Sequence, residues 1–143
     1  IEILTPETDT DLNLPFVENG ISAGFPSPAE DLPTEQLDLT KRLVSNPLST
    51  YFMRVAGDSM IDAGIYDGSY VIVDRSIKPM HGHIIVAFVD NELTIKYLYQ
   101  KNGRMRLEAA NPSFLPIIPR EGSTIQVFGV SKTTFMALPG FSI

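Results

Sequence analysis

The sequence predicts a mostly β protein, a small and partly rolled antiparallel β domain with one short helix and an extended N-terminal arm. Short segments rich in β-branched and aromatic residues follow one another closely from residue 51 onward, as in all-β folds. Two of the links between these segments, Asp90-Asn91 and Asn102-Gly103, have residues that favour tight hairpin turns. One stretch alone has the signals of a helix.

Residues 1–30 are predicted to form the arm, and residues 31–143 the β-rich domain. The arm has little periodicity, and its prolines and glycines do not favour a packed element. Its segment "ENGISAGFPSPAEDLP" has small residues and is expected to be extended and accessible. The arm contains four prolines: Pro6, Pro15, Pro26 and Pro28.

The predicted helix lies in "DLTKRLVSNP", where Asp38 can cap its first turn and Asn46-Pro47 ends it. Its apolar face would consist of Leu39, Leu43 and Val44. The predicted strands follow the helix, at 51–56, 69–74, 83–89, 93–99 and 104–109, and residues 124–137 supply one or two more.

Composition excludes several classes of function. The 143 residues suit one domain with a sizeable core. A net charge of −6 argues against strong direct binding to nucleic acid. The absence of cysteine excludes disulfides and thiolate metal sites. No apolar run approaches the roughly 20 residues of a membrane span, and no secretory signal is visible, so we expect a soluble cytoplasmic protein without a cofactor.

The polar residues at turns have ordinary explanations. His81 and His83 in "MHGH" lack further ligands at metal-binding spacing, so a turn is expected there and no metal. Four aspartates are expected mostly to hydrogen-bond their own backbone at turns and strand ends. These are Asp58, Asp62, Asp67 and Asp74.

Ser59 stands at a turn between two apolar strands and needs a base to act as a nucleophile. A Ser-His-Asp triad would have to recruit His81 or His83 and remains an alternative. A neutral lysine is the other option, and burial lowers a lysine pKa. Lys96 lies in the apolar strand "LTIKYLY". It either points outward on a polar face or is buried for a purpose, and strand alternation by itself favours the outward position.

Three linked segments resemble the LexA/UmuD group of self-cleaving serine-lysine peptidases. They are "GDSMIDAGIYDGSYVIVD", "HGHIIVAFVDNELTIKYL" and "LEAANPSFLPI". The resemblance covers roughly residues 20–138, and the separation of 37 residues between Ser59 and Lys96 also matches. One position departs from the family pattern, because His83 replaces the usual aspartate after Gly82. We expect this change to affect a turn and not the chemistry.

The resemblance implies a role for each matching residue. Ser59 would be the nucleophile and Lys96 the general base, while the backbone N–H groups of Asp58 and Ser59 would hold the oxyanion. The family cuts its own chain at an Ala-Gly or Cys-Gly bond before the catalytic body, and Ala23-Gly24 stands in the matching place. The product would be residues 24–143.

Within the family, the UmuD-like branch fits best. Only 23 residues precede the cleavage site, this segment is acidic and contains prolines, and no helix-turn-helix is visible in it. The resemblance then implies a homodimer whose cleavage is stimulated by the RecA–single-stranded DNA filament. It also implies a UmuC-type Y-family polymerase partner for translesion synthesis in the SOS response. Two alternatives remain, the catalytic domain of a LexA-type repressor without its DNA-binding domain, or a noncatalytic β-fold binding module.

Overall fold

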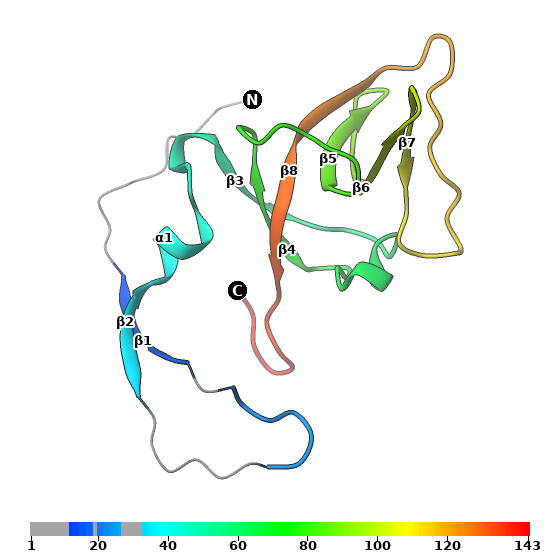
Figure 1. Ribbon diagram of the computed structural model, residues 1–143. Coiled ribbons are helices and arrows are strands. Elements are labelled where there is room, and N and C mark those ends of the chain that lie inside the picture. The colour runs from blue at the N-terminus through cyan, green and yellow to red at the C-terminus, as the bar shows by residue number, and fades with distance from the viewer. Residues whose placement is uncertain (1–11, 19, 27–32) are drawn as a thin grey trace. The chain divides into compact units, whose positions relative to one another are not determined.

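The computed structural model describes residues 12–18, 20–26 and 33–143, in two units. The first unit ends at Pro47, and the second comprises Leu48–Ile143 (Figure 1). The boundary predicted near residue 30, between the arm and the β-rich domain, lies outside the described residues.

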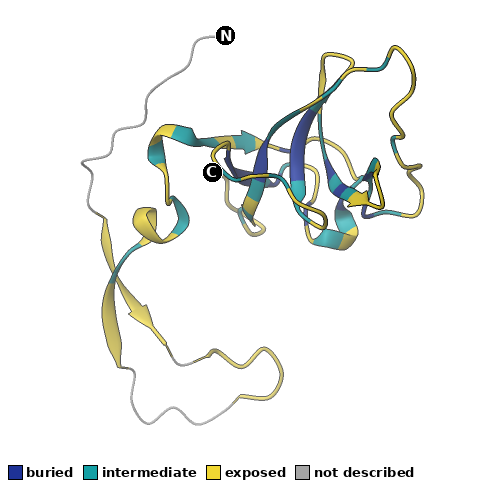
Figure 2. Cartoon of the chain, turned by 45° about the horizontal axis from the view of Figure 1, so that its top comes forward, coloured by how far each residue is buried: buried dark blue, intermediate teal, exposed yellow. Residues whose placement is uncertain are grey.

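The first unit contains a two-stranded antiparallel sheet, in which β1 (Asn13–Val17) pairs with β2 (Thr34–Asp38). No strand was predicted in the arm, and β1 is therefore an element that the sequence analysis missed. Both strands of such a sheet are edges, where a proline such as Pro15 is tolerated. The residues of β1 are all exposed (Figure 2), so this strand has no buried face whose alternation could have revealed it.

The predicted helix is confirmed as α1 (Leu39–Leu43). The Asp38 side chain accepts a hydrogen bond from the Lys41 N–H at 3.1 Å and caps the first turn as expected. A short 3₁₀ turn, η1 (Pro47–Ser49), follows and leads into the second unit.

The second unit is built on one six-stranded antiparallel sheet, which confirms the mostly β fold class. Its strand order is β3-β4-β8-β5-β6-β7, so the last strand in the sequence lies at the centre between β4 and β5 (Figure 1). Every strand predicted in this unit is present, and residues 124–137 supply a single one. The strands are β3 (Thr50–Arg54), β4 (Tyr70–Asp74), β5 (Ile84–Val89), β6 (Glu92–Lys101), β7 (Arg104–Glu108) and β8 (Ile125–Phe135).

The two predicted hairpin turns are confirmed by their backbone conformation. Asp90 and Asn91, which join β5 to β6, have φ values of 48° and 68°. Asn102 and Gly103, which join β6 to β7, have φ values of 53° and 72°. Positive φ at both central residues is the requirement of a type I′ turn, and aspartate, asparagine and glycine meet it at least cost.

The core lies on both faces of the sheet. Successive residues of β5 point to opposite faces, and accordingly Val86 belongs to one buried cluster while Ile85 and Ala87 belong to another. The first cluster also includes Met60, which is 1% exposed and directly follows Ser59. The turn that bears Ser59 is therefore fixed to the core of the second unit.

Replacing Gly129 by alanine is expected to lower the free energy of unfolding by about 1–3 kcal/mol, the usual cost of overpacking. A Cβ there would lie 2.8 Å from Val73 Cγ1 and 3.2 Å from the Asp74 carbonyl oxygen, both in fully buried residues of β4. Urea denaturation measures the change. The control is Gly20→Ala, since a Cβ at Gly20 meets no atom within 4 Å. An unchanged Gly129→Ala midpoint would contradict this packing.

Candidate active site

Ser59 lies in the turn between β3 and a short 3₁₀ element, η2 (Ile61–Ala63). Gly57 has φ of 99°, a conformation that side chains disfavour, and its N–H donates to Asp67 Oδ1 at 2.8 Å. The Asp67 carboxylate therefore binds backbone ten residues away, whereas a bond to its own local backbone was the expectation. Asp74 does bond locally, because its Oδ1 accepts the Ser76 N–H at 2.8 Å.

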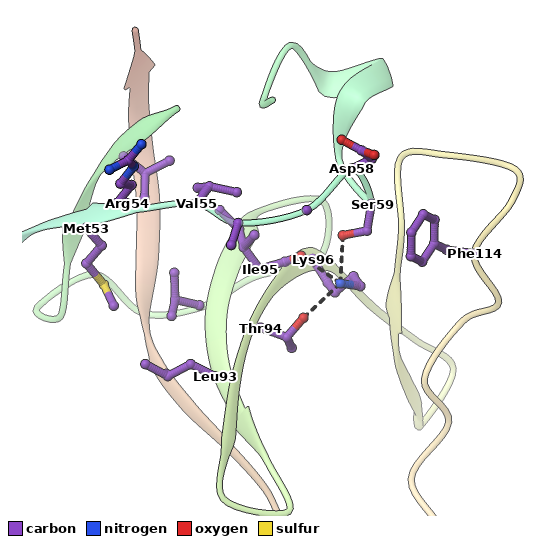
Figure 3. A pocket seen from close by; sticks show the side chains of 14 residues that line it. Met53, Arg54, Val55, Asp58, Ser59, Leu93, Thr94, Ile95, Lys96 and Phe114 are labelled. Carbon is purple, nitrogen blue, oxygen red and sulfur yellow. Dashed lines mark hydrogen bonds between the residues drawn. The ribbon is translucent and has the colours of Figure 1, made fainter. Parts of the chain in front are cut away.

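Lys96 reaches the same turn from β6. Its Nζ lies 2.9 Å from Ser59 Oγ, 2.8 Å from Thr94 Oγ1 and 3.1 Å from the Ile95 carbonyl oxygen (Figure 3). The structure thus brings the predicted serine and lysine together. The hydrogen-bonding partner of Ser59 Oγ is a lysine and not a histidine, which argues against the triad alternative.

The outward position that strand alternation favoured for Lys96 is wrong, since this residue is 8% exposed. Alternation places Lys96 on the same face of β6 as Leu98, which is 3% exposed. Its neighbours Ile95 and Tyr97, on the other face, are half-buried. Both faces of the strand are covered, and the rule that a polar residue marks the solvent face does not hold there.

Burial lowers the pKa of Lys96 below its ordinary value of 10.5, because desolvation disfavours the ammonium ion. In the part of the chain that the structure describes, no carboxylate forms a salt bridge with this lysine. The cost of desolvation is therefore not offset by an opposite charge. A lysine in this setting is more often neutral than an exposed one, and a neutral amine can accept the proton of a serine hydroxyl.

The backbone of the turn presents two donors. Within the described residues, neither the Asp58 N–H nor the Ser59 N–H donates a hydrogen bond. The carbonyl oxygens of the same two residues are paired, since Asp58 O accepts from Asn111 Nδ2 and Ser59 O accepts from the Ala110 N–H, each at 2.9 Å. The sequence alone assigns no role to Asn111 or Thr94. The bond from Asn111 to Asp58 joins segments 53 residues apart, and the bond from Lys96 to Thr94 depends on the direction of the two side chains.

A pocket of about 380 Å³ adjoins the serine and the lysine. Figure 3 shows Phe114 beside the two residues, while Met53 and Leu93 lie further along the pocket. Its wall is largely apolar, which keeps Lys96 poorly solvated. The apolar residues that line it are Met53, Val55, Ala56, Val71, Val86, Leu93, Ile95 and Phe114.

Both histidines accept hydrogen bonds from the backbone. His83 Nδ1 accepts the Met80 N–H at 3.1 Å, and His81 Nδ1 accepts the Gln100 N–H at 3.0 Å. The substitution of histidine for aspartate after Gly82 thus places a ring nitrogen where it accepts a bond within a turn, as expected. Among residues 12–18, 20–26 and 33–143 we find no group of three or more His, Cys, Asp or Glu residues suited to a metal ion, and no helix long and apolar enough to cross a membrane.

Ala23 and Gly24 lie in the first unit, in an exposed bend. The Ser22 hydroxyl donates a hydrogen bond to the Phe25 carbonyl oxygen across the bend. The neighbouring side chains of Ile21 and Phe25 are 96% and 93% exposed. A Cβ on Gly24 would meet no atom within 4 Å, so packing in this unit does not require glycine there.

Comparisons with known proteins identify a family and several relatives of this chain. The Peptidase S24-like family matches residues 15–132. The chain is 41% identical to MucA of Escherichia coli over 129 residues, which are 89% of this chain and 87% of MucA. It is 40% identical to SamA of Salmonella typhimurium over 81% of this chain and 80% of SamA. It is 38% identical to the LexA repressor of Syntrophotalea carbinolica over 77% of this chain but 54% of LexA.

Proposed function

The chain belongs to the peptidase S24 family, and on this premise we propose that it is a UmuD-like SOS-response protein that cleaves its own Ala23-Gly24 bond. The observation that carries the proposal is the 2.9 Å contact between Lys96 Nζ and Ser59 Oγ. A buried lysine with a lowered pKa, without a carboxylate partner among the described residues, is suited to be the base. A noncatalytic binding module would gain nothing from this contact, because a buried lysine costs stability.

In the proposed reaction, neutral Lys96 accepts the hydroxyl proton of Ser59 while Oγ attacks the Ala23 carbonyl carbon. The tetrahedral intermediate collapses when the bond between Ala23 carbon and Gly24 nitrogen breaks. The Lys96 ammonium returns its proton to the departing amine of Gly24. Water then attacks the Ala23 ester on Ser59 and gives a proton to Lys96. The bond between the Ala23 carbonyl carbon and Oγ breaks, Lys96 returns the proton to Oγ, and residues 1–23 are released.

The oxyanion of each tetrahedral intermediate would be held by the N–H groups of Asp58 and Ser59. Both donors are without a partner among the described residues, and the carbonyl oxygens of Asp58 and Ser59 are bound elsewhere. A donor fixed in place before the reaction stabilises developing charge without further reorganisation. This role rests on the turn geometry and not on any side chain of the turn.

The arm would supply the substrate. The Ala23-Gly24 bond lies in an exposed bend, and the small side chains on both sides of the bond allow a close approach to Ser59. Packing within the first unit does not require glycine at position 24. If cleavage requires glycine there, the reason would be the close approach of the scissile bond to Ser59. A substrate carried on the same chain, or on a partner copy, has a high effective concentration.

The partners in the proposal follow from the UmuD-like branch. The chain is 41% identical to MucA over 87% of MucA, which supports the UmuD-like branch. We infer a homodimer whose cleavage is stimulated by the RecA–single-stranded DNA filament. The shortened chain would then act as the accessory subunit of an error-prone, UmuC-type Y-family polymerase. The net charge of −6 fits a role in which RecA and the polymerase contact the DNA.

Incubation of the purified protein is expected to yield a new mass that matches residues 24–143, faster at alkaline than at neutral pH. The pKa of Lys96 is lowered by burial, so the neutral fraction rises with pH and the rate levels off above the folded pKa. Intact-mass spectrometry across a pH series measures both the site and the rate, with and without RecA filament.

The control is Gly24→Val, which adds a branched side chain at the scissile bond while Ser59 and Lys96 stay unchanged. It is expected to remain intact, because the bulk hinders the approach of Oγ to the carbonyl carbon. Absence of the fragment from the unsubstituted protein at every pH, even with RecA filament, would contradict the proposed function.

A further inference from the structure

Asn111 connects the segment after β7 to the turn that bears Ser59. Its Nδ2 donates to the Asp58 carbonyl oxygen at 2.9 Å, across 53 residues of sequence. The same oxygen receives a second, longer bond from the Ile61 N–H at 3.4 Å. The amide of Asn111 is therefore the nearer of the two donors that hold this carbonyl group.

The Asp58 carbonyl group and the Ser59 N–H belong to one peptide unit. That unit is trans, because the structure has no cis peptide bond among its described residues, and in a trans unit the C=O and N–H point in opposite directions within one plane. A bond that fixes the direction of the carbonyl oxygen therefore also fixes the direction of the N–H. Rotation of this plane would turn the Ser59 N–H away from the oxyanion without moving Ser59 Oγ far.

The Asn111 side chain is itself held in place. Its Oδ1 accepts the Ser113 N–H at 3.0 Å, and its backbone carbonyl accepts the Phe114 N–H at 3.1 Å. The preceding residue, Ala110, exchanges backbone bonds with the turn, accepting from the Asp62 N–H and donating to Ser59 O. Both ends of the Asn111 amide are thus engaged, one with its own turn and one with Asp58.

We propose that Asn111 is a positioning residue, whose amide orients the Ser59 N–H toward the oxyanion of the cleavage reaction. This inference rests on the proposed self-cleavage. It differs from the roles of Ser59 and Lys96 because Asn111 acts through a peptide plane and touches neither the attacking oxygen nor the proton.

Two substitutions separate the contact with Asp58 from the turn at Asn111. Asn111→Ala removes both amide functions, whereas Asn111→Ser keeps a short oxygen that can accept the Ser113 N–H but cannot reach Asp58 O. Both are expected to slow cleavage about 10–100-fold on the alkaline plateau, in the range of a lost or misdirected oxyanion donor. Neither changes a partner of Lys96, so the midpoint of the pH profile should stay in place.

Thermal unfolding of each variant shows whether it is folded, and Ser113→Ala is the matched control because it keeps the backbone N–H that Asn111 binds. Wild-type rates in both Asn111 variants would overturn the proposal. So would recovery of the wild-type rate in Asn111→Ser alone, which would reduce Asn111 to a turn residue. A shifted midpoint in the pH profile of the cleavage rate would assign the effect to Lys96, and this result would also overturn the proposal.

The amide resonance of Ser59 in a ¹H–¹⁵N correlation spectrum is a second readout that does not depend on cleavage. Both Asn111 variants are expected to shift it, whereas Ser113→Ala leaves it in place. If the unsubstituted chain never cleaves, the proposed function fails, and this spectrum alone decides whether Asn111 holds the Ser59 peptide unit. An unmoved resonance in both variants overturns the inference.

Discussion

Replacing Ser59 by alanine is expected to abolish self-cleavage, with a fall in rate of at least about 10³-fold. The substitution removes the oxygen that lies 2.9 Å from Lys96 Nζ and leaves the base with no hydroxyl to deprotonate there. Residual hydrolysis by water is slow because backbone donors and binding alone supply only a fraction of the catalysis. Intact-mass spectrometry under the conditions that convert the unsubstituted chain measures the loss.

The fold is expected to survive Ser59→Ala. The turn is fixed by the buried Met60 side chain and by backbone bonds of Gly57 and Ala110, and none of these involves the Ser59 hydroxyl. Ser113→Ala, at an exposed serine of the adjoining segment, is the control and should cleave at the unsubstituted rate. Formation of residues 24–143 by Ser59→Ala at a comparable rate would show that another group attacks the bond.

The strands of the second unit could be predicted because local chemistry and tertiary structure agree there. The two hairpins demand positive φ values, and Asp90, Asn91, Asn102 and Gly103 are residues that accept them. In the first unit β1 contains Pro15, which argues against a strand, and its pairing with β2 joins segments about 20 residues apart. Such pairing leaves little local signal.

The candidate site was predictable in its residue types and not in its supporting contacts. Ser59 and Lys96 came from motifs, whereas alternation misplaced Lys96 because it cannot reveal that both faces of β6 are covered. Asn111 was missed, since its bond to Asp58 crosses 53 residues. Asp67 was given a local role, although it binds Gly57 across 10 residues. Only the folded sheet shows which segments meet at the turn.

Replacing Lys96 by methionine is expected to abolish cleavage while it stabilises the fold. Methionine has a similar length but offers no base, so the cleavage rate should fall by at least about 10³-fold, as for Ser59→Ala. The apolar pocket wall suits a thioether better than an amine. We expect the free energy of unfolding to rise by about 0.5–2 kcal/mol, the common gain when a group retained for activity is replaced.

The gain in stability should depend on pH in a direction set by the lowered pKa. Between the folded pKa of Lys96 and its ordinary value of 10.5, the unfolded chain binds more protons, so the stability of the unsubstituted protein rises with pH. The penalty of the buried ammonium is therefore complete below the folded pKa and disappears as pH approaches 10.5. The advantage of Lys96→Met is largest at neutral pH and shrinks in alkaline solution.

Urea denaturation of both proteins from neutral to alkaline pH measures this advantage, and Lys101→Met is the matched control. Lys101 lies on the same strand but is exposed, so its replacement should change stability little at any pH. A Lys96→Met advantage that grows with pH would mean that the folded protein favours the ammonium over the amine. Lys96 would then be a poor base, and the chemistry proposed for Ser59 would lose its proton acceptor.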